Sequence, residues 1–150
     1  MTKRFSINFL SFIFCAFILF SCKKNDATNT GTGTLVEQLF ESEILNHDFI
    51  VNLAYDGSTD ITTTYNGYTF RLLKTDYYNG PLQVKKGTNT YMGTWSSNSD
   101  YSKLTITLPS TPSDFVFLTK EWRFISKNLP QLKLSPWFGP ANVELDILRQ

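Results

Sequence analysis

From Phe49 to the end of the chain, hydrophobic and polar residues alternate with a period of two over short runs. This period is typical of β-strands that bury one face and expose the other. Segments rich in Gly, Asn, Asp and Pro, such as YDGSTD, YYNGPL and SPWFGPAN, separate the runs and are typical of turns. The pattern predicts eight strands, at residues 49–55, 68–72, 82–85, 91–96, 103–108, 122–124, 132–134 and 143–147.

Residues 34–44 follow a helical pattern instead. Thr34 and Glu37 have the spacing of a capping box, in which each side chain accepts a hydrogen bond from the other residue's backbone N–H. A second helical turn is predicted within residues 114–121, with Ser113 or Asp114 as its cap. The first helix is expected to pack over one end or side of the strands, because hydrophobic residues recur at helical spacing at Leu35, Val36, Leu39, Phe40 and Ile44.

Consecutive short strands joined by tight turns favour an antiparallel meander. Closing such a meander into a barrel removes its exposed edges. The sequence therefore predicts an all-β fold, an antiparallel eight-stranded barrel with a short N-terminal helix. A β-sandwich of two sheets is the alternative, because strands that bury one face occur in both architectures.

The first 21 residues are basic at their start and then apolar. Lys3 and Arg4 precede an apolar run over residues 7–20 that ends at the small residue Ser21. A transmembrane helix needs about 20 apolar residues, and this run is shorter. A basic start, a short apolar core and a small residue at the exit are typical of a secretory signal.

The four residues Leu19-Phe20-Ser21-Cys22 resemble the lipobox of bacterial lipoproteins, although Phe20 is larger than the residue usual there. The resemblance implies a diacylglycerol group on the Cys22 sulfur, cleavage before Cys22, and a further acyl chain such as palmitate on the new amino group. Two or three acyl chains anchor a soluble domain firmly. The alternative is an uncleaved N-terminal anchor with an incidental cysteine.

These features divide the chain into three parts. Residues 1–21 are the predicted lipoprotein signal peptide. Residues 22–33 contain the small and polar run KKNDATNTGTG, which is predicted to be a flexible tether because it has no apolar side chains to bury. Residues 34–150 are the predicted barrel domain.

Charge and residue types exclude several chemistries. Once residues 1–21 are removed, twelve basic and thirteen acidic residues remain, and they form no basic patch, so no nucleic-acid partner is expected. With Cys15 removed and Cys22 lipidated, the domain has no thiol for disulfides or catalysis. The lone His47 and the turn at residues 56–60 are interpreted as structural. We expect no catalytic residue, no metal site and no cofactor, and the protein is predicted not to be an enzyme.

Five segments, in this order, resemble the small lipocalin-like (calycin-type) lipoproteins of Bacteroidota. The resemblance spans residues 49–148 and implies a lipocalin-like barrel. Together with lipidation, it predicts an outer-membrane protein facing the periplasm or the cell surface. In lipocalins proper a Gly-x-Trp lies on the first strand, whereas here Gly93-Thr94-Trp95 lies in mid-chain, so the resemblance does not itself supply their ligand pocket. The segments are NGYTFRLL (66–73), YMGTWSS (91–97), SKLTITLPSTP (102–112), FLTKEWRFIS (117–126) and QLKLS (131–135).

Aromatic residues make up 15% of the chain and suggest where function lies. An eight-stranded barrel is either filled by side chains or holds one small ligand. The first hypothesis is a barrel that binds a small apolar or amphipathic ligand, with aromatic side chains as its lining and Arg71 or Arg123 near its mouth. The predicted ligand-binding residues are Tyr68, Phe70, Arg71, Tyr91, Trp95, Trp122 and Phe124.

The alternative hypothesis is a non-enzymatic structural or accessory lipoprotein with a filled barrel. Its loops are then the functional surface and contact a protein or glycan partner. Tyrosines are suited to such contacts because they combine an apolar ring with a polar hydroxyl. Four of them, Tyr65, Tyr77, Tyr78 and Tyr101, lie in predicted turns, where they either contact such a partner or pack within the loops.

Overall fold

The computed structural model describes residues 33–150, and these lie within one compact unit, Gly31–Gln150. The predicted signal peptide, Cys22 and nearly all of the predicted tether lie outside the described residues. The helical segments are α1 (Leu35–Glu43), the 3-10 helix η1 (Thr62–Tyr65) and α2 (Phe115–Leu118). The strands are β1 (Asp48–Asp56), β2 (Thr59–Asp60), β3 (Tyr68–Leu72), β4 (Asn79–Lys86), β5 (Asn89–Ser97), β6 (Lys103–Thr107), β7 (Glu121–Ser126), β8 (Gln131–Pro136) and β9 (Glu144–Arg149).

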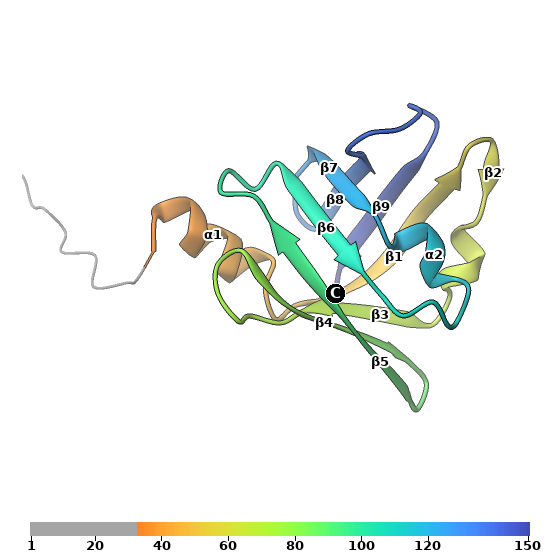
Figure 1. Cartoon of the computed structure of the whole chain (residues 1–150), viewed down its shortest axis with the longest axis horizontal. Helices are drawn as coiled ribbons and strands as arrows, with labels where there is room; N and C mark the ends of the chain where they lie inside the picture. The colour runs from red at the N-terminus through yellow and green to blue at the C-terminus, as the bar shows by residue number, and fades with distance from the viewer. Residues whose placement is uncertain (1–32) are drawn as a thin grey trace, which may run out of the picture. The chain divides into compact units, whose positions relative to one another are not determined.

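Strands β1 and β3–β9 form a closed antiparallel barrel (Figure 1). They pair in chain order, and β9 returns to β1 through pairs that run from Phe49–Arg149 to Tyr55–Glu144. The prediction of an eight-stranded antiparallel barrel with a short N-terminal helix is therefore confirmed, and the sandwich is not formed. The two-residue strand β2 forms a hairpin with the end of β1 and was not predicted, because two residues show no period.

The inward and outward positions follow the predicted alternation. On β4, Leu82 and Val84 are buried, whereas Gln83 is only partly buried and Lys85 is exposed. Next to them, Gly80 pairs with Trp95 of β5. A Cβ atom at Gly80 would lie 1.9 Å from the Leu73 carbonyl oxygen, so a larger residue does not fit there. The same carbonyl accepts a hydrogen bond of 2.7 Å from the Trp95 indole N–H, which holds this large side chain inside the barrel.

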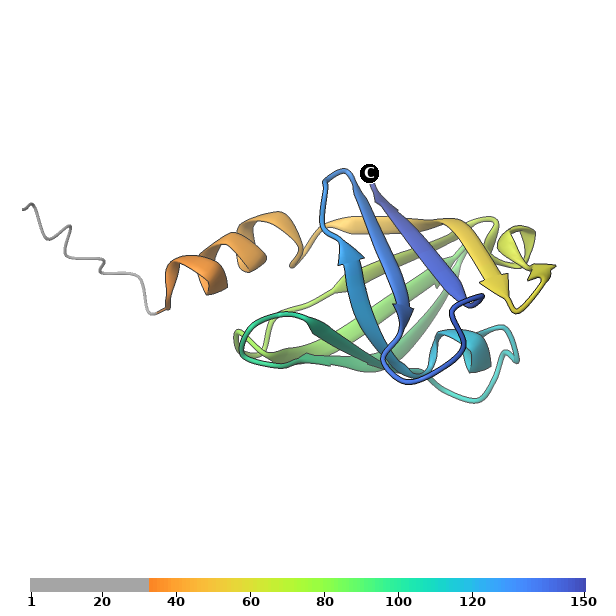
Figure 2. The same cartoon turned by 90° about the horizontal axis from the view of Figure 1, so that it is seen from above.

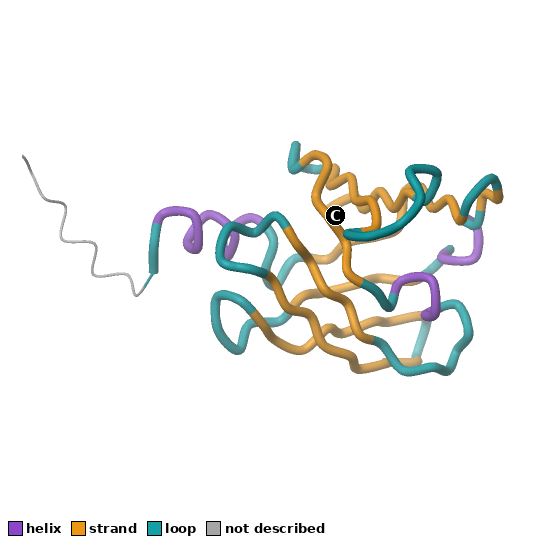
Figure 3. Tube along the Cα trace, turned by 45° about the horizontal axis from the view of Figure 1, so that its top comes forward, coloured by secondary structure: helices purple, strands orange, loops and turns teal. Residues whose placement is uncertain are grey.

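Helix α1 lies at one end of the barrel, and α2 and η1 lie at the other (Figures 2 and 3). The predicted capping box of α1 is present, with Thr34 and Glu37 bonding each other's backbone N–H. Phe40 stacks on Tyr101 of the β5–β6 loop with ring centroids 4.1 Å apart, and Phe40 and Ile44 are buried. These contacts hold α1 against the barrel.

The predicted helical turn after β6 is α2, and it plugs the other end of the barrel. Phe115 and Leu118 are buried, and the Trp122 indole N–H donates to the Leu118 carbonyl oxygen at 2.9 Å. Asp114 precedes the helix as predicted, but its side chain makes no capping bond. Its carboxylate instead accepts a hydrogen bond of 3.1 Å from the Tyr68 hydroxyl, which ties α2 to β3.

Two of the four turn tyrosines are buried, so of the two alternatives left open by the sequence, packing within the fold holds for these residues. Tyr65 lies under α2 and donates to the Asp114 carbonyl oxygen at 2.8 Å. Tyr101 has a positive φ of 53°, packs under Phe40 and donates to the Tyr77 carbonyl oxygen at 2.8 Å. Both side chains are turned into the ends of the barrel, where they serve packing.

Buried tyrosines predict a loss of stability at alkaline pH. Burial, together with the hydrogen bond to Asp114, raises the pKa of Tyr68 to about 12, and burial also raises the pKa of Tyr65 and Tyr101. Tyrosine in an unfolded chain ionises near pH 10. The folded protein therefore retains protons that the unfolded chain releases, and the free energy of unfolding should fall as pH rises from about 10 to 12.

Tyr68→Phe should make this alkaline decline less steep. At neutral pH it should also lower the free energy of unfolding by about 1 kcal/mol, because the hydrogen bond to Asp114 is lost. Urea denaturation measured between pH 7 and 12 gives both quantities. Tyr55→Phe, at a partly exposed position of β1, is the control and should change stability at pH 7 by less than about 0.5 kcal/mol. An unchanged alkaline slope in Tyr68→Phe would contradict this account.

Candidate functional site

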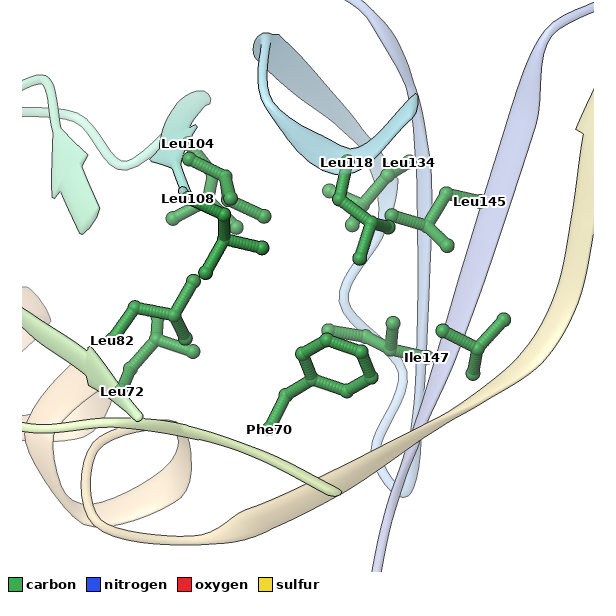
Figure 4. Close-up of a pocket in the computed structure, with 11 residues that line it drawn as sticks. Phe70, Leu72, Leu82, Leu104, Leu108, Leu118, Leu134, Leu145 and Ile147 are labelled. Carbon is green, nitrogen blue, oxygen red and sulfur yellow. The ribbon is translucent and has the colours of Figure 1, made fainter. Parts of the chain in front are cut away.

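The barrel interior contains a cavity of about 30 Å³ (Figure 4). A water molecule needs roughly 10–15 Å³, and an apolar cavity that binds benzene has a volume of about 150 Å³. The space is therefore too small for an organic ligand. Every side chain that lines it is apolar: Val51, Phe70, Leu72, Leu82, Leu104, Ile106, Leu108, Leu118, Leu134, Leu145 and Ile147.

Aromatic side chains close the barrel on both sides of this cavity. Trp95 is buried and packs against Phe40 of α1 with ring centroids 5.9 Å apart. Trp122 is buried and packs edge-on against Phe117 of α2 at 5.5 Å. The aliphatic side chains that line the cavity face one another across it in Figure 4. The interior is a packed core with a small gap at its centre.

The predicted ligand-binding aromatics belong to this core. Phe70 lines the cavity, whereas the other five do not. Tyr68 and Tyr91 both pack edge-on against Phe115 of α2, at 5.6 and 5.1 Å between ring centroids. Phe124 is partly buried, with the Lys127 ammonium 4.9 Å from its ring centroid. The expected clustering on one side of the strands is confirmed for these residues together with Trp95 and Trp122. A role in ligand binding stays a prediction.

Arg71 lies on the outside of the barrel, where it joins β3 to β1. Its guanidinium donates two hydrogen bonds to the Asp48 carboxylate, at 2.7 and 2.6 Å. These bonds lower the pKa of Asp48 and raise that of Arg71. The two strands pair through Asp48–Arg71 and Phe49–Phe70. This ion pair therefore clamps a short seam in the barrel wall, and Arg71 is not among the residues that line the cavity.

The β8–β9 loop carries an exposed phenylalanine, Phe138, beside a partly buried tryptophan, and sequence reasoning selected neither. Phe138 is 85% exposed, and its ring lies edge-on to Trp137 with centroids 6.3 Å apart. Trp137 is partly buried, and its backbone N–H donates to the Glu121 carbonyl oxygen at 2.8 Å. This bond fixes the loop to β7. The signal available in the sequence was an aromatic dipeptide within the turn SPWFGPAN.

A second exposed apolar surface of the protein lies on helix α1. Leu35, Val36 and Leu39 are 80%, 53% and 59% exposed, although they share the helical spacing of the buried residues Phe40 and Ile44. The spacing predicts an apolar face and does not show how much of that face the barrel covers. The start of β8 and the end of β9 lie near α1, because the Arg149 N–H donates to the carbonyl oxygen of Pro130, just before β8, and the Arg149 guanidinium donates to the Glu43 carboxylate of α1. The loop between β8 and β9 therefore lies at the opposite end of the barrel.

The polar residues considered for catalysis have structural contacts. His47 follows α1, and its Nε2 donates to the Ser42 carbonyl oxygen at 2.9 Å, as expected for a capping histidine. Residues 33–150 contain no group of three or more His, Cys, Asp or Glu side chains placed to hold a metal ion. In the same residues, no helix is long and apolar enough to cross a bilayer. The expected absence of a catalytic residue and of a cofactor stays a prediction.

Comparison of the chain with family models, curated proteins and solved structures finds no match. The structure thus establishes an antiparallel β-barrel protein by its own geometry. The resemblance to lipocalin-like lipoproteins of Bacteroidota stays a prediction from the five sequence segments.

Leu118→Ala tests whether the interior is filled. Leu118 is buried on α2 and lines the cavity, so the substitution should cost about 2–5 kcal/mol and enlarge the cavity. The enlarged, dry cavity should bind xenon or benzene, which the unmodified protein should not. Xenon-induced NMR shifts and the rise of melting temperature with benzene measure this.

Val116→Ala is the matched control, because Val116 lies on the same helix and is 64% exposed. It should change stability by less than about 0.5 kcal/mol and create no binding site. Uptake of benzene by the unmodified protein would show that the barrel opens and would contradict a filled interior.

Proposed function

We propose that this protein is a non-enzymatic accessory lipoprotein of the outer membrane, in which a filled barrel displays a partner-binding loop. The observation that carries the proposal is the small size of the interior cavity, because the core side chains enclose an apolar space of only about 30 Å³. Ligand sites for small molecules usually measure about 300–1,000 Å³. A barrel packed in this way acts through its surface.

The predicted lipid on Cys22 anchors the barrel to the membrane. Each buried methylene contributes about 0.8 kcal/mol, so two or three acyl chains hold the protein firmly. The polar residues 23–33 then separate the lipid from α1. This arrangement makes the barrel a peripheral domain that faces the periplasm or the cell exterior.

The exposed Phe138 supports the β8–β9 loop as the partner-binding surface. Aromatic side chains are enriched at interfaces because they bury a large area at low cost in conformational entropy. Phe138 projects from a loop that is fixed by the Trp137 backbone and by the buried Pro136. The loop lies at the end of the barrel away from α1, the element that follows the predicted tether in sequence, so we expect a protein or glycan to approach it without meeting the membrane (Figure 1).

A carrier of a small apolar ligand is the second candidate. Two observations favour it: the lining of the cavity is entirely apolar, and β1 and β3 pair through only two register positions. Separation of this short seam is one route by which the cavity could admit a ligand. In that case the unmodified barrel takes up benzene or xenon in the experiment on Leu118.

Cys22→Ala tests the anchor. The variant should lose all incorporation of a clickable fatty-acid analogue, because no other acylation site is predicted. Cys15→Ala is the matched control and should leave the labelling unchanged, since Cys15 lies in the predicted signal peptide. Persistent labelling of the Cys22→Ala protein would contradict lipidation at this residue.

A photoreactive phenylalanine analogue in place of Phe138 tests the loop. In living cells it should form a crosslinked adduct whose mass identifies a protein or a glycan partner. The same analogue in place of Ile125, which is 60% exposed on β7, is the control and should form none. Phe138→Ser should abolish partner binding while changing stability by less than about 0.5 kcal/mol. A folded, anchored chain that gives no adduct at position 138 would argue against this surface.

A further inference from the structure

The apolar face of α1 is wider than the part that the barrel covers. Phe40 and Ile44 pack on the barrel, whereas Leu35, Val36 and Leu39 lie on the adjoining side of the helix and are more than half exposed. Leu35 and Leu39 are four residues apart, so their side chains are neighbours on the helix surface. The three exposed residues therefore form one apolar strip, which we call the α1 strip.

A groove continues this strip toward the barrel. Its volume is about 370 Å³, which is far larger than that of the interior cavity. One wall is the helix, and the other is Tyr101 of the β5–β6 loop with Lys127 and Leu129 of the β7–β8 loop. The groove is mainly apolar, and its charged lining residues are Glu43 and Lys127, whose ammonium lies 4.9 Å from the centroid of the Phe124 ring. Strip and groove together make a continuous apolar surface at one end of the barrel.

Polar contacts fix the rotation of α1, so that the strip stays exposed. On one side of the helix, Glu37 accepts a hydrogen bond from the Tyr78 hydroxyl, and Glu41 pairs with Lys74 at 2.7 Å. Near the helix end, Glu43 pairs with Arg149 of β9 at 2.9 Å. The helix cannot roll the α1 strip onto the barrel without breaking these contacts. The strip is therefore a fixed surface of the domain.

The length of the chain before α1 indicates which apolar phase lies within reach of the α1 strip. Eleven residues, 23–33, separate Cys22 from the helix cap Thr34. A flexible segment of this length spans roughly 18 Å on average, and at most about 40 Å when fully extended. With Cys22 lipidated, as the proposed function requires, α1 is the first folded element above the bilayer and lies within reach of its surface.

We infer that the α1 strip and the adjoining groove dock onto the bilayer that holds the lipidated Cys22. The inference rests on the lipid anchor of the proposed function. Amphipathic helices bind at the boundary of headgroups and acyl chains through such an apolar face. The tether keeps the strip at a millimolar effective concentration near the surface, so a weak intrinsic affinity suffices. Docking turns the α1 end of the barrel toward the membrane and the β8–β9 loop away from it.

The experiment places an environment-sensitive NBD fluorophore on a cysteine introduced by Leu39→Cys. Residues 33–150 contain no cysteine, and Leu39 is exposed, so labelling is specific and leaves the fold intact. Met92→Cys, at an exposed position of β5 on the outer surface of the barrel, is the matched control. Each labelled chain is bound to vesicles whose lipids carry a quencher in the acyl region. We expect quenching at position 39 to exceed quenching at position 92 several-fold.

Two forms of the chain allow docking of the α1 strip to be tested independently of lipidation at Cys22. The first is the full lipidated chain in vesicles. The second comprises residues 23–150 with an N-terminal histidine tag, held on nickel-chelating lipids, and it needs no lipid on Cys22. Quenching at position 39 in both forms supports docking. Quenching only in the tagged form, with no lipidated product from cells, supports docking and contradicts lipidation at Cys22.

Vesicle-bound chains whose position 39 is no better quenched than position 92 would overturn docking while leaving the anchor intact. A blue shift at position 39 that depends on protein concentration and not on the lipid quencher would also overturn it. In that case the α1 strip is covered by a second copy of the chain.

Discussion

Pairing between β1 and β9 closes the sheet, and this closure determines what the other side chains can do. In an open sheet the period-two pattern separates a solvent-exposed polar face from an apolar one. Once β9 pairs with β1, the apolar face becomes an enclosed interior whose size is set by the number of strands. Eight strands leave a space that ordinary side chains can fill. Large residues such as Trp95 and Trp122 then decide whether any of that space remains.

Closure leaves the two ends of the barrel to be covered, and the two helices cover them by different means. Helix α2 plugs its end with buried aromatic and aliphatic side chains and is tied to β3 through Tyr68 and Asp114. Helix α1 and the residues after it cover the other end with Phe40, Ile44 and Leu45, and the helix is held at its flanks by hydrogen bonds and ion pairs. One end is therefore a continuation of the core, and the other is a partly apolar surface.

The sequence predicts the barrel well because alternation is a local property. The eight main strands and the capping box at Thr34 each depend on residues close together in the chain. Burial in turns depends instead on distant partners. Tyr101 is buried because its positive φ directs the ring beneath Phe40, some 60 residues earlier in the chain, and no local pattern shows this contact.

The candidate site was less predictable for a related reason. The volume of the cavity depends on how eleven side chains from separate elements meet, which alternation does not specify. Arg71 is outside the barrel because its position alternates with Phe70 and Leu72, so the period itself places it away from a ligand inside. For α1, the helical period predicts an apolar face, whereas the width of the covering barrel surface decides that Leu35 and Leu39 remain exposed.

Under the proposed function, the packed interior and the two unlike ends make orientation more important for this protein than enclosure. The strands of the barrel are rigid and connect the ends directly, so an attachment at α1 sets the direction in which the β8–β9 loop points. The predicted tether alone would leave this direction free, because a flexible segment transmits no torque. A second contact at the α1 end would restrict it. A fixed apolar strip on α1 and an exposed Phe138 at the opposite end of the barrel are the arrangement that such a restriction requires.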